Sequence, residues 1–349
     1  MDASCVLVDS LSQSRLIIEP NFGCVATSWT VAGDERLALP SARDAFLASS
    51  RTGGIPLLYP YANRLRSDTC EVAGKHLDFA VIASLKRDPG GLPIHGLLLR
   101  WPAWKLSRRG ENHLEASLRW HDHAELMRAY SFAHTLRISW TLSGDAATAV
   151  LAVTTSIEAD GGVDVPIAFG WHPYFAVDLA SATSLALPRR TSIALDAQGL
   201  PQRHADARGA AACAGLASDA RGSLAASSES AGENQDSLYA LDAQANAGAP
   251  PAAAALPGAV PDALLRTPPA PGESHRASVT NDRITTEIDF SREYRFMQVF
   301  SPRGAPFVCI EPMSAATAAL SDGCEMVTAG ETFAATFTLR SSAHARLLA

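Results

Sequence analysis

The chain has 349 residues, 47% of them hydrophobic and 19% charged, with a formal net charge of −7. Such an apolar chain is not disordered, and it is long enough to bury a core without disulfide or metal staples. The acidic balance argues against a nucleic-acid partner and against a polybasic membrane-surface protein. Because the N-terminus does not resemble a signal peptide and no apolar run could span a bilayer, we expect a cytoplasmic protein with a small neutral partner.

The regular segments of the chain have the period-two pattern of half-buried strands. In chain order they are residues 114–120, 137–142, 149–157, 284–290 and 332–339. Turn-forming Gly, Pro, Asp and Ser clusters separate them, and no convincing helical stretch lies between them. The sequence therefore predicts an all-β fold with mainly antiparallel sheets.

Two compositional features concern the organisation of the chain. Residues 205–259 are rich in alanine but interrupted by glycines, and they lack the large apolar side chains of a packed face. We expect one domain over residues 1–349, with a mobile low-complexity insertion at about 205–259. The six cysteines include no Cys-x-x-Cys pair, which predicts free thiols and excludes a zinc ribbon or a dithiol redox motif.

Two early stretches carry candidate polar site residues. In residues 56–66, prolines favour an extended chain that contains Asn63 and Arg64, and a guanidinium can grip a sugar hydroxyl or a carboxylate. A surface strand with solvated arginines would show the same pattern. His95 precedes Gly96, which permits a turn or a close approach to a ligand. A structural histidine is the alternative there.

The stretch Phe-Gly-Trp-His-Pro-Tyr-Phe at residues 169–175 is more informative. Pro173 keeps His172 out of a helix, and aromatic rings surround this histidine in sequence. Trp171 and Tyr174 could stack on the C–H face of a sugar, while the pKa of the histidine could lie near working pH. A core histidine buried among rings, with a backbone partner, is the alternative.

A carboxylate follows four apolar residues in the stretch at 307–313. Glu311 is therefore expected at the end of a buried strand, where an acidic side chain needs a partner or a task. An ionised Glu311 could remove the proton of an anomeric hydroxyl while a protonated His172 donates to the ring oxygen. Ring opening, rotation about C1–C2 and reclosure would invert the anomeric centre, and neither a metal nor a cofactor is required.

Taken together, the stretches around Asn63-Arg64, His95-Gly96, residues 169–175 and residues 309–312 resemble the aldose 1-epimerase (galactose mutarotase-like) family. The resemblance runs in order from about residue 17 to about residue 339. It implies an antiparallel β-supersandwich and an isomerase that interconverts the α and β anomers of a free hexose.

The resemblance also implies roles for individual residues. His172 would be the general acid and Glu311 the general base, while Asn63, Arg64 and His95 would hold the sugar. The family also uses an aspartate between the two halves of the chain. Asp236 has the best matching context in this sequence, and Asp206 is the lesser candidate. The chain would act as a monomer or a homodimer.

Three alternatives stay open at the level of sequence. A cupin-like metal site could use the pair His121 and His123, although Glu125 comes too soon for that pattern and a solvated turn fits better. A hexose-6-phosphate epimerase would need a cationic clamp, for which Arg87, Arg100, Arg108 and Arg109 are candidates. A sugar-binding protein without catalysis would need no matched acid and base.

Overall fold

The structure is a computed structural model that describes residues 4–108, 110–181, 183–188, 190–202, 236–241, 254–256, 275–302 and 304–344. Its sheets are antiparallel, and the described helices are short, as the sequence predicts. None of those helices has the length and apolar character needed to cross a membrane. The five described cysteines are free thiols, as expected, and Cys213 lies outside the described residues.

The largest sheet has nine strands in the order β18-β15-β19-β20-β24-β11-β10-β9-β8. The long central strands β10 and β11 form because β-branched and aromatic residues alternate there with small polar ones, so that one face of each strand is buried. All five predicted strands are confirmed within this sheet. The bounds are β8 (Lys105–Arg108), β9 (His113–Arg119), β10 (Thr135–Gly144), β11 (Thr148–Glu158), β15 (Thr183–Ala186), β18 (Ala254–Leu256), β19 (His275–Thr280), β20 (Ile284–Phe290) and β24 (Thr332–Ala343).

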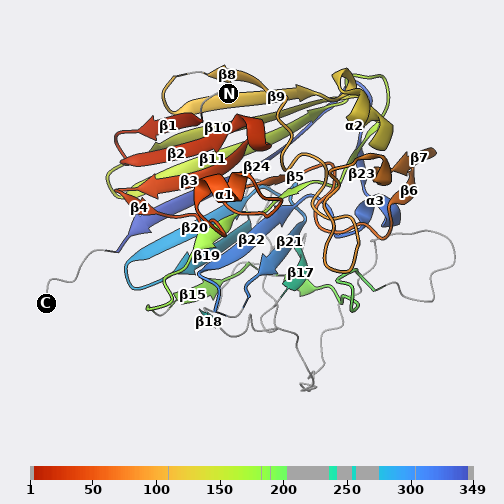
Figure 1. Ribbon diagram of the computed structural model, residues 1–349. Coiled ribbons are helices and arrows are strands. Elements are labelled where there is room, and N and C mark those ends of the chain that lie inside the picture. The colour runs from red at the N-terminus through yellow and green to blue at the C-terminus, as the bar shows by residue number, and fades with distance from the viewer. Residues whose placement is uncertain are drawn as a thin grey trace, which may run out of the picture.

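Two further sheets complete the sandwich (Figure 1). The four-stranded sheet consists of β1 (Cys5–Asp9), β2 (Ser14–Glu19), β3 (Val25–Val31) and β4 (Asp34–Glu35), and it packs against β10. The other sheet has the order β16-β17-β21-β22-β13-β5, with β14 pairing β22. Its strands are β5 (Leu57–Leu58), β13 (Gly170–Trp171), β14 (Tyr174–Ala176), β16 (Arg190–Ser192), β17 (Asp236–Leu241), β21 (Phe296–Phe300) and β22 (Phe307–Met313).

Short elements connect and cover these sheets. The small two-stranded sheets are β6 (Thr69–Val72) with β7 (Lys75–Asp78), and β12 (Val165–Ile167) with β23 (Glu325–Val327). The α-helices are α1 (Arg43–Leu47), α2 (Ala124–Ala129) and α3 (Ala319–Asp322), and the 3₁₀ turns are η1 (Pro20–Phe22), η2 (Phe79–Val81) and η3 (Trp120–Asp122).

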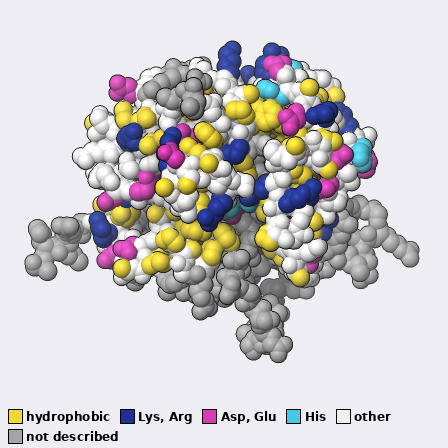
Figure 2. Space-filling model, in the orientation of Figure 1, with side chains coloured by type: hydrophobic (Ala, Val, Ile, Leu, Met, Phe, Trp, Pro, Cys, Tyr) yellow, Lys and Arg dark blue, Asp and Glu magenta, His cyan; other side chains and the backbone are white. Residues whose placement is uncertain are grey.

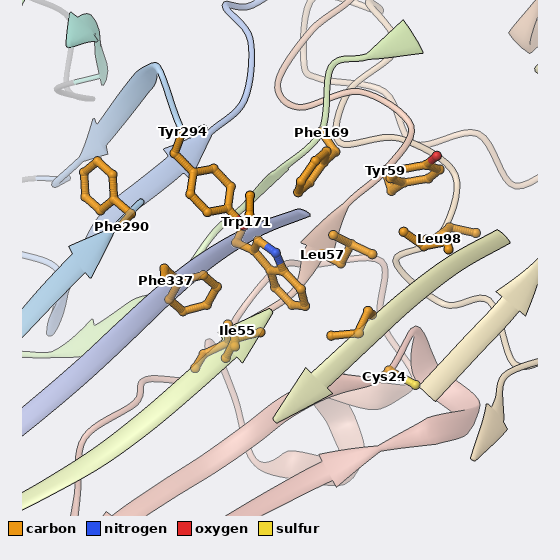
Figure 3. Close-up of a cluster of buried hydrophobic side chains, with 14 of the residues drawn as sticks. Cys24, Ile55, Leu57, Tyr59, Leu98, Phe169, Trp171, Phe290, Tyr294 and Phe337 are labelled. Carbon is orange, nitrogen blue, oxygen red and sulfur yellow. The ribbon is translucent and has the colours of Figure 1, made fainter. Parts of the chain in front are cut away.

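An aromatic core lies between the large sheet and the sheet that contains β22. Trp171 is fully buried, with its ring centroid 5.7 Å from that of Phe337, and Phe169 contacts Tyr294 edge to face (Figure 3). Aromatic side chains dominate because each buries a large apolar area and edge-to-face pairs add a favourable contact. This core fixes β13, and therefore the histidine that follows it.

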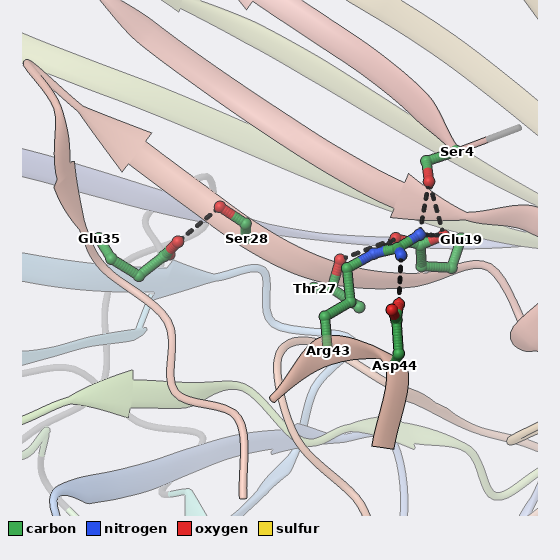
Figure 4. A network of polar contacts seen from close by, with 7 residues as sticks. All are labelled: Ser4, Glu19, Thr27, Ser28, Glu35, Arg43 and Asp44. Atoms are coloured by element: carbon green, nitrogen blue, oxygen red, sulfur yellow. Dashed lines mark hydrogen bonds and ion pairs between the residues drawn. The ribbon is translucent and has the colours of Figure 1, made fainter. Parts of the chain in front are cut away.

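A polar network fixes helix α1 on the neighbouring sheet. The buried carboxylate of Glu19 accepts hydrogen bonds from Arg43, from Thr27 at 3.1 Å and from Ser4 at 2.9 Å (Figure 4). A buried charge is tolerated when all its hydrogen bonds are made, as they are here. The network anchors the segment that leads from α1 to residues 49–52, which contact the site described below.

Two segments of the expected insertion at about 205–259 are strands. Within it, β17 pairs with β16 and β21, and β18 pairs with β15, so both segments belong to the sheets. The rest of the stretch lies outside the described residues.

Candidate active site

Strand register brings His172 and Glu311 together. Gly170 of β13 pairs with Met313, and Tyr174 of β14 pairs with Cys309, so the two-residue link between β13 and β14 lies opposite Glu311 of β22. The backbone N–H of His172 donates to the carbonyl of Pro56 at 3.1 Å. Residues far apart in the chain therefore meet because three short strands share one sheet.

The two side chains form a buried pair. His172 Nε2 lies 3.3 Å from Glu311 Oε1, and the relative exposures of the residues are 4% and 1%. The Nδ1 atom of His172 is buried and has no hydrogen-bond partner among the described residues. A structural histidine normally satisfies both ring nitrogens, so this geometry favours a reactive group over a core residue.

Tyr174 and Thr52 hold the imidazole in place. The Tyr174 ring stacks on His172 with an interplanar angle of 12° and a centroid distance of 4.5 Å. Its hydroxyl lies 3.3 Å from His172 Nε2 and 2.6 Å from Thr52 Oγ1. The structure thus places Tyr174 against the imidazole of the pair.

His95 lies beside the pair in a restricted backbone conformation. Its ring contacts that of His172 edge to face, with 5.3 Å between centroids. Its φ of 65° is rare for a residue with a Cβ, and such strain gathers at functional sites. Gly96 is required next to it, because a Cβ there would lie 2.2 Å from the Tyr59 carbonyl oxygen.

Asn63 also has a left-handed backbone, with φ 52°, and reaches the same sheet. Its Nδ2 donates to Gln298 Oε1 at 3.0 Å and to Thr317 Oγ1 at 3.1 Å, and all three residues are buried. Gln298 pairs directly with Glu311 in the β21–β22 register. Asn63 therefore belongs to a polar network that flanks Glu311.

Arg64 is held by an ion pair that the sequence did not predict. Its Nε lies 2.6 Å from Asp88 Oδ2, and the side chains are 19% and 7% exposed. Asp88 also accepts a hydrogen bond from the Leu92 N–H, and with Arg64 this holds the pKa of Asp88 below its usual range despite the opposing effect of burial. Gly199 closes over Arg64, since a Cβ there would lie 2.8 Å from a terminal guanidinium nitrogen.

Burial controls the protonation of the two histidines of the site. Burial lowers the pKa of His172 to about 3, so its imidazole is neutral at neutral pH in the empty site. Burial also lowers the pKa of His95, and the positive charges of Lys86 and Arg64 act in the same direction. Desolvation is therefore the physical reason why the empty site favours the neutral imidazole of His172.

Trp171 and Asp236 are two expected sugar contacts that the structure does not place beside the pair. Trp171 does not face the pair: it lies in the core, and its indole N–H donates to Thr155 Oγ1 at 2.9 Å. Successive residues of a strand alternate between faces, so Trp171 and His172 cannot share one. The backbone of Asp236 begins β17, two strands from Glu311, while its side chain lies outside what the structure describes. Asp206 lies outside the described residues.

The cupin-like metal site considered above would use His121 and His123, which belong to a different part of the fold. His121 is in the 3₁₀ turn η3, and His123 follows it with its ring edge-on to Trp101. Across the described ranges, no group of three or more His, Cys, Asp or Glu side chains is arranged to hold a metal ion. The His121–His123 motif therefore lies in a turn and not on the face of a strand.

Sequence reasoning missed three residues of the site. Gln298 could have been noticed, because it is a lone polar residue in the apolar strand Phe-Met-Gln-Val-Phe. Asp88 begins an Asp-Pro-Gly-Gly turn, where an aspartate is common for structural reasons alone, and no sequence pattern marks Thr52. Asp88 reaches the site through its ion pair with Arg64, and Thr52 through its contact with Tyr174, and both partners are distant along the chain.

Fold and site together define an all-β sandwich protein with a buried imidazole–carboxylate pair on one sheet. The family model for aldose 1-epimerase matches residues 11–211, more than half of the chain. The chain belongs to the aldose 1-epimerase family, and its fold is the galactose mutarotase-like β-supersandwich.

Solved structures with this fold are distant in sequence. The Slr1438 protein of Synechocystis sp. PCC 6803 is 22% identical with a TM-score of 0.68, over 99% of this chain and 97% of that one. A GalM/aldose epimerase homologue from C. elegans is 15% identical with a TM-score of 0.63, over 98% and 100%. Galactose 1-epimerase from Lactobacillus acidophilus NCFM is 13% identical with a TM-score of 0.62, over 97% and 94%. No curated protein matches the sequence.

Proposed function

We propose that the protein is an isomerase, an aldose 1-epimerase that interconverts the α and β anomers of a hexose. The observation that carries this proposal is the buried contact of 3.3 Å between His172 Nε2 and Glu311 Oε1. Anomer exchange requires one group that accepts the proton of the anomeric hydroxyl and one that donates to the ring oxygen. Membership of the aldose 1-epimerase family supports the same reaction.

The two groups must share one transferable proton. In the mechanism proposed here, the anomeric hydroxyl donates a hydrogen bond to the Glu311 carboxylate, and the ring oxygen accepts one from His172. Both hydrogen bonds favour an imidazolium beside a carboxylate over the neutral imidazole of the empty site. Glu311 then takes the proton from O1, His172 gives its proton to O5, and the C1–O5 bond breaks to leave an open-chain aldehyde.

Reclosure reverses these transfers. After rotation about C1–C2, the O5 hydroxyl attacks the other face of C1, His172 recovers its proton from O5, and Glu311 returns a proton to O1. Every proton is back in place at the end of the cycle, so the reaction consumes none. Each positioned transfer contributes typically about 10²–10⁴ in rate.

The neighbouring polar residues position the sugar in this proposal. His95 contacts the His172 ring, and Asn63 binds Gln298, which pairs with Glu311 in the strand register. Arg64 has a rigid fork suited to adjacent hydroxyls, and its charge acts on His95. A free hexose is the simplest substrate of this reaction, and a hexose 6-phosphate is the second candidate. We further propose a cytoplasmic protein that acts as a monomer or homodimer.

Polarimetry on freshly dissolved α-glucose and α-galactose tests this proposal. Wild type should accelerate mutarotation, and Glu311→Gln and His172→Asn should each lower kcat by about 10²–10⁴. Glu71→Gln and His76→Asn are matched controls, because this Glu–His pair has a separation of 2.7 Å but is exposed. Full activity in either site variant, or a wild type no faster than buffer on every free and phosphorylated aldose, would refute the proposal.

A further inference from the structure

A pair of hydroxyl groups lies next to the imidazole of the candidate site. Thr52 Oγ1 lies 2.6 Å from the Tyr174 hydroxyl, and that hydroxyl lies 3.3 Å from His172 Nε2. Tyr174 is buried, whereas Thr52 is half-buried. The three side chains therefore form a chain of contacts that leads from Thr52 to the group that would donate a proton to the sugar.

The Tyr174 oxygen faces His172 from outside the plane of the imidazole. The two rings are within 12° of parallel and their centroids are 4.5 Å apart, so one ring lies above the other. An imidazole nitrogen donates or accepts a hydrogen bond in the plane of its ring. The hydroxyl hydrogen of Tyr174 is therefore poorly aligned toward Nε2, the atom that also lies 3.3 Å from Glu311 Oε1.

Thr52 is the better-placed acceptor for the hydroxyl hydrogen of Tyr174. Their separation of 2.6 Å is that of a short O–H···O hydrogen bond. Burial raises the pKa of Tyr174 well above its usual value, so the phenol keeps its hydrogen, and a buried hydroxyl needs an acceptor for it. When Thr52 accepts this hydrogen, the lone pairs of the Tyr174 oxygen are left to face the imidazole.

The backbone next to Thr52 is fixed to the strand that contains Tyr174. The N–H of Tyr174 donates to the Gly54 carbonyl at 2.8 Å, and the N–H of Gly54 donates to the Ala38 carbonyl at 2.9 Å. Gly54 has a φ of 65°, and a Cβ there would lie 2.1 Å from the Ala26 carbonyl oxygen, so the position requires glycine. The Thr52 hydroxyl is thus held in a defined place relative to Tyr174.

Basic side chains brace the residues that precede this threonine. Lys86 Nζ donates to the Ser50 carbonyl at 2.8 Å. Arg100 donates to the carbonyls of Ser49 at 3.1 Å and Arg51 at 2.7 Å. Figure 2 shows several Lys and Arg side chains around the centre of the face on which Figure 1 shows α1 and β22. Backbone carbonyls accept these hydrogen bonds, which therefore stabilise the position of the segment.

The arginines that the sequence suggested for a phosphate clamp have other contacts. Arg100 braces the segment just described, and Arg87 pairs with Asp68 at 2.7 Å. Arg109 and the side chain of Arg108 lie outside what the structure describes. Arg87 and Arg100 are therefore engaged within the chain.

We propose that Thr52 is a positioning residue for the acid of this site and acts through Tyr174. The Thr52 hydroxyl accepts the hydrogen of the Tyr174 hydroxyl, and the Tyr174 oxygen then presents its lone pairs to His172 and favours a hydrogen on Nε2. That hydrogen is the one that His172 gives to the ring oxygen, so the inference rests on the proposed epimerase function. The oxygen lone pair and the aromatic face also stabilise the imidazolium that forms during turnover.

Polarimetry on variants of Thr52 tests this role. Thr52→Val nearly keeps the shape of the side chain but removes the acceptor, so the Tyr174 hydroxyl turns toward Nε2, and kcat should fall about tenfold with KM changed by less than about twofold. Thr52→Ser retains the hydroxyl and should keep kcat within about threefold of wild type. Thr154→Val is the matched control, because its hydroxyl pairs with that of Thr336 at 2.8 Å on the large sheet, and its kcat should equal that of wild type.

A double-mutant cycle separates this role from a merely structural one. If Thr52 acts through the Tyr174 hydroxyl, Tyr174→Phe should lower kcat about tenfold, and Thr52→Val added to it should lower kcat no further. Additive losses in the double variant would overturn the inference. An unchanged kcat in Thr52→Val, or an equal loss in Thr52→Ser, would overturn it as well.

The tautomer of His172 gives a readout that does not depend on turnover. In nitrogen NMR of the imidazole rings, the signals of His172 are identified by their absence in His172→Asn. Wild type and Thr52→Ser should have the hydrogen on Nε2, and Thr52→Val should shift it toward Nδ1. If wild type accelerates no sugar, the epimerase function fails, and the NMR comparison still tests the placement of the hydrogen. If wild type is active and Thr52→Val keeps the wild-type tautomer, the inference about Thr52 fails alone.

Discussion

Two buried histidines of this protein, His134 and His172, differ in how their ring nitrogens are used. His134 Nδ1 donates to the Phe132 carbonyl at 2.7 Å, its Nε2 accepts from the Tyr59 hydroxyl at 2.6 Å, and its ring stacks on Trp120. His172 is equally buried, but its Nε2 faces Glu311 and its Nδ1 has no hydrogen-bond partner among the described residues.

Burial by itself therefore does not identify a functional histidine. Desolvation lowers the pKa of both residues, to about 4 in His134 and about 3 in His172. The difference lies in hydrogen bonding: one imidazole is locked in a single tautomer by two neutral partners, whereas the other faces a carboxylate with which it can exchange a proton. The first arrangement stabilises the fold, and the second is suited to acid–base chemistry.

The largest expected effects come from substituting the two histidines in parallel. His134→Asn should lower the free energy of unfolding by about 3 kcal/mol, because it opens a gap beside Trp120 and leaves buried polar groups of Tyr59 and Phe132 unpaired. His172→Asn should cost less stability than this, because Nδ1 of His172 has no hydrogen-bond partner to lose among the described residues, while it should abolish most of the activity. Urea unfolding measures the first quantity. Equal losses of stability in the two variants would erase the distinction.

A second expectation concerns acid stability. A histidine with a folded pKa below its unfolded value stabilises the protein fully above the unfolded value of about 6.5, and this stabilisation is lost as the pH falls. For His134, with a folded pKa of about 4, the loss is about 2 kcal/mol between pH 7 and pH 5. Urea unfolding at both pH values should show at least this loss in the wild type, since the pKa of His172 is lowered as well, and a loss smaller by about 2 kcal/mol in His134→Gln. An unchanged pH dependence in the variant would show that His134 contributes none of it.

Two aspartate–arginine pairs extend the comparison to the surroundings of the site. Asp88→Asn should raise KM for the sugar by about tenfold with a smaller change in kcat, because Arg64 would lose the partner that orients it. Asp68→Asn is the control, since its pair with Arg87 is exposed and expected to contribute little. Steady-state polarimetry measures both constants. A drop in kcat alone for Asp88→Asn would contradict the positioning role.

The smallest expected effect is the absence of an inflection in the pH profile. Because burial holds the pKa of His172 near 3, kcat/KM of the free enzyme should show no midpoint near pH 6.5 in either direction. Rates measured between pH 5 and pH 8, corrected for buffer-catalysed mutarotation at each pH, check this. A midpoint near 6.5 would mean that the imidazole titrates as an exposed histidine does.

Much of this molecule follows from local sequence. Period-two alternation predicted five of the nine strands of the large sheet, since a strand with one buried face must alternate. The local chemistry of Gly96 and Pro173 restricted the backbone around the two histidines next to them. Those features act over a few residues, and the sequence therefore contains them directly.

The tertiary structure alone decided which side chains meet. Strand register placed His172 opposite Glu311 and sent Trp171 into the core, and long-range contacts joined Arg64 to Asp88 and Asn63 to Gln298. The same is true of protonation, because only packing determines how far the His172 imidazole is removed from water. The sequence by itself determined the fold class and singled out His172 and Glu311 as candidates, while the environment of these two residues depends on segments that are distant along the chain.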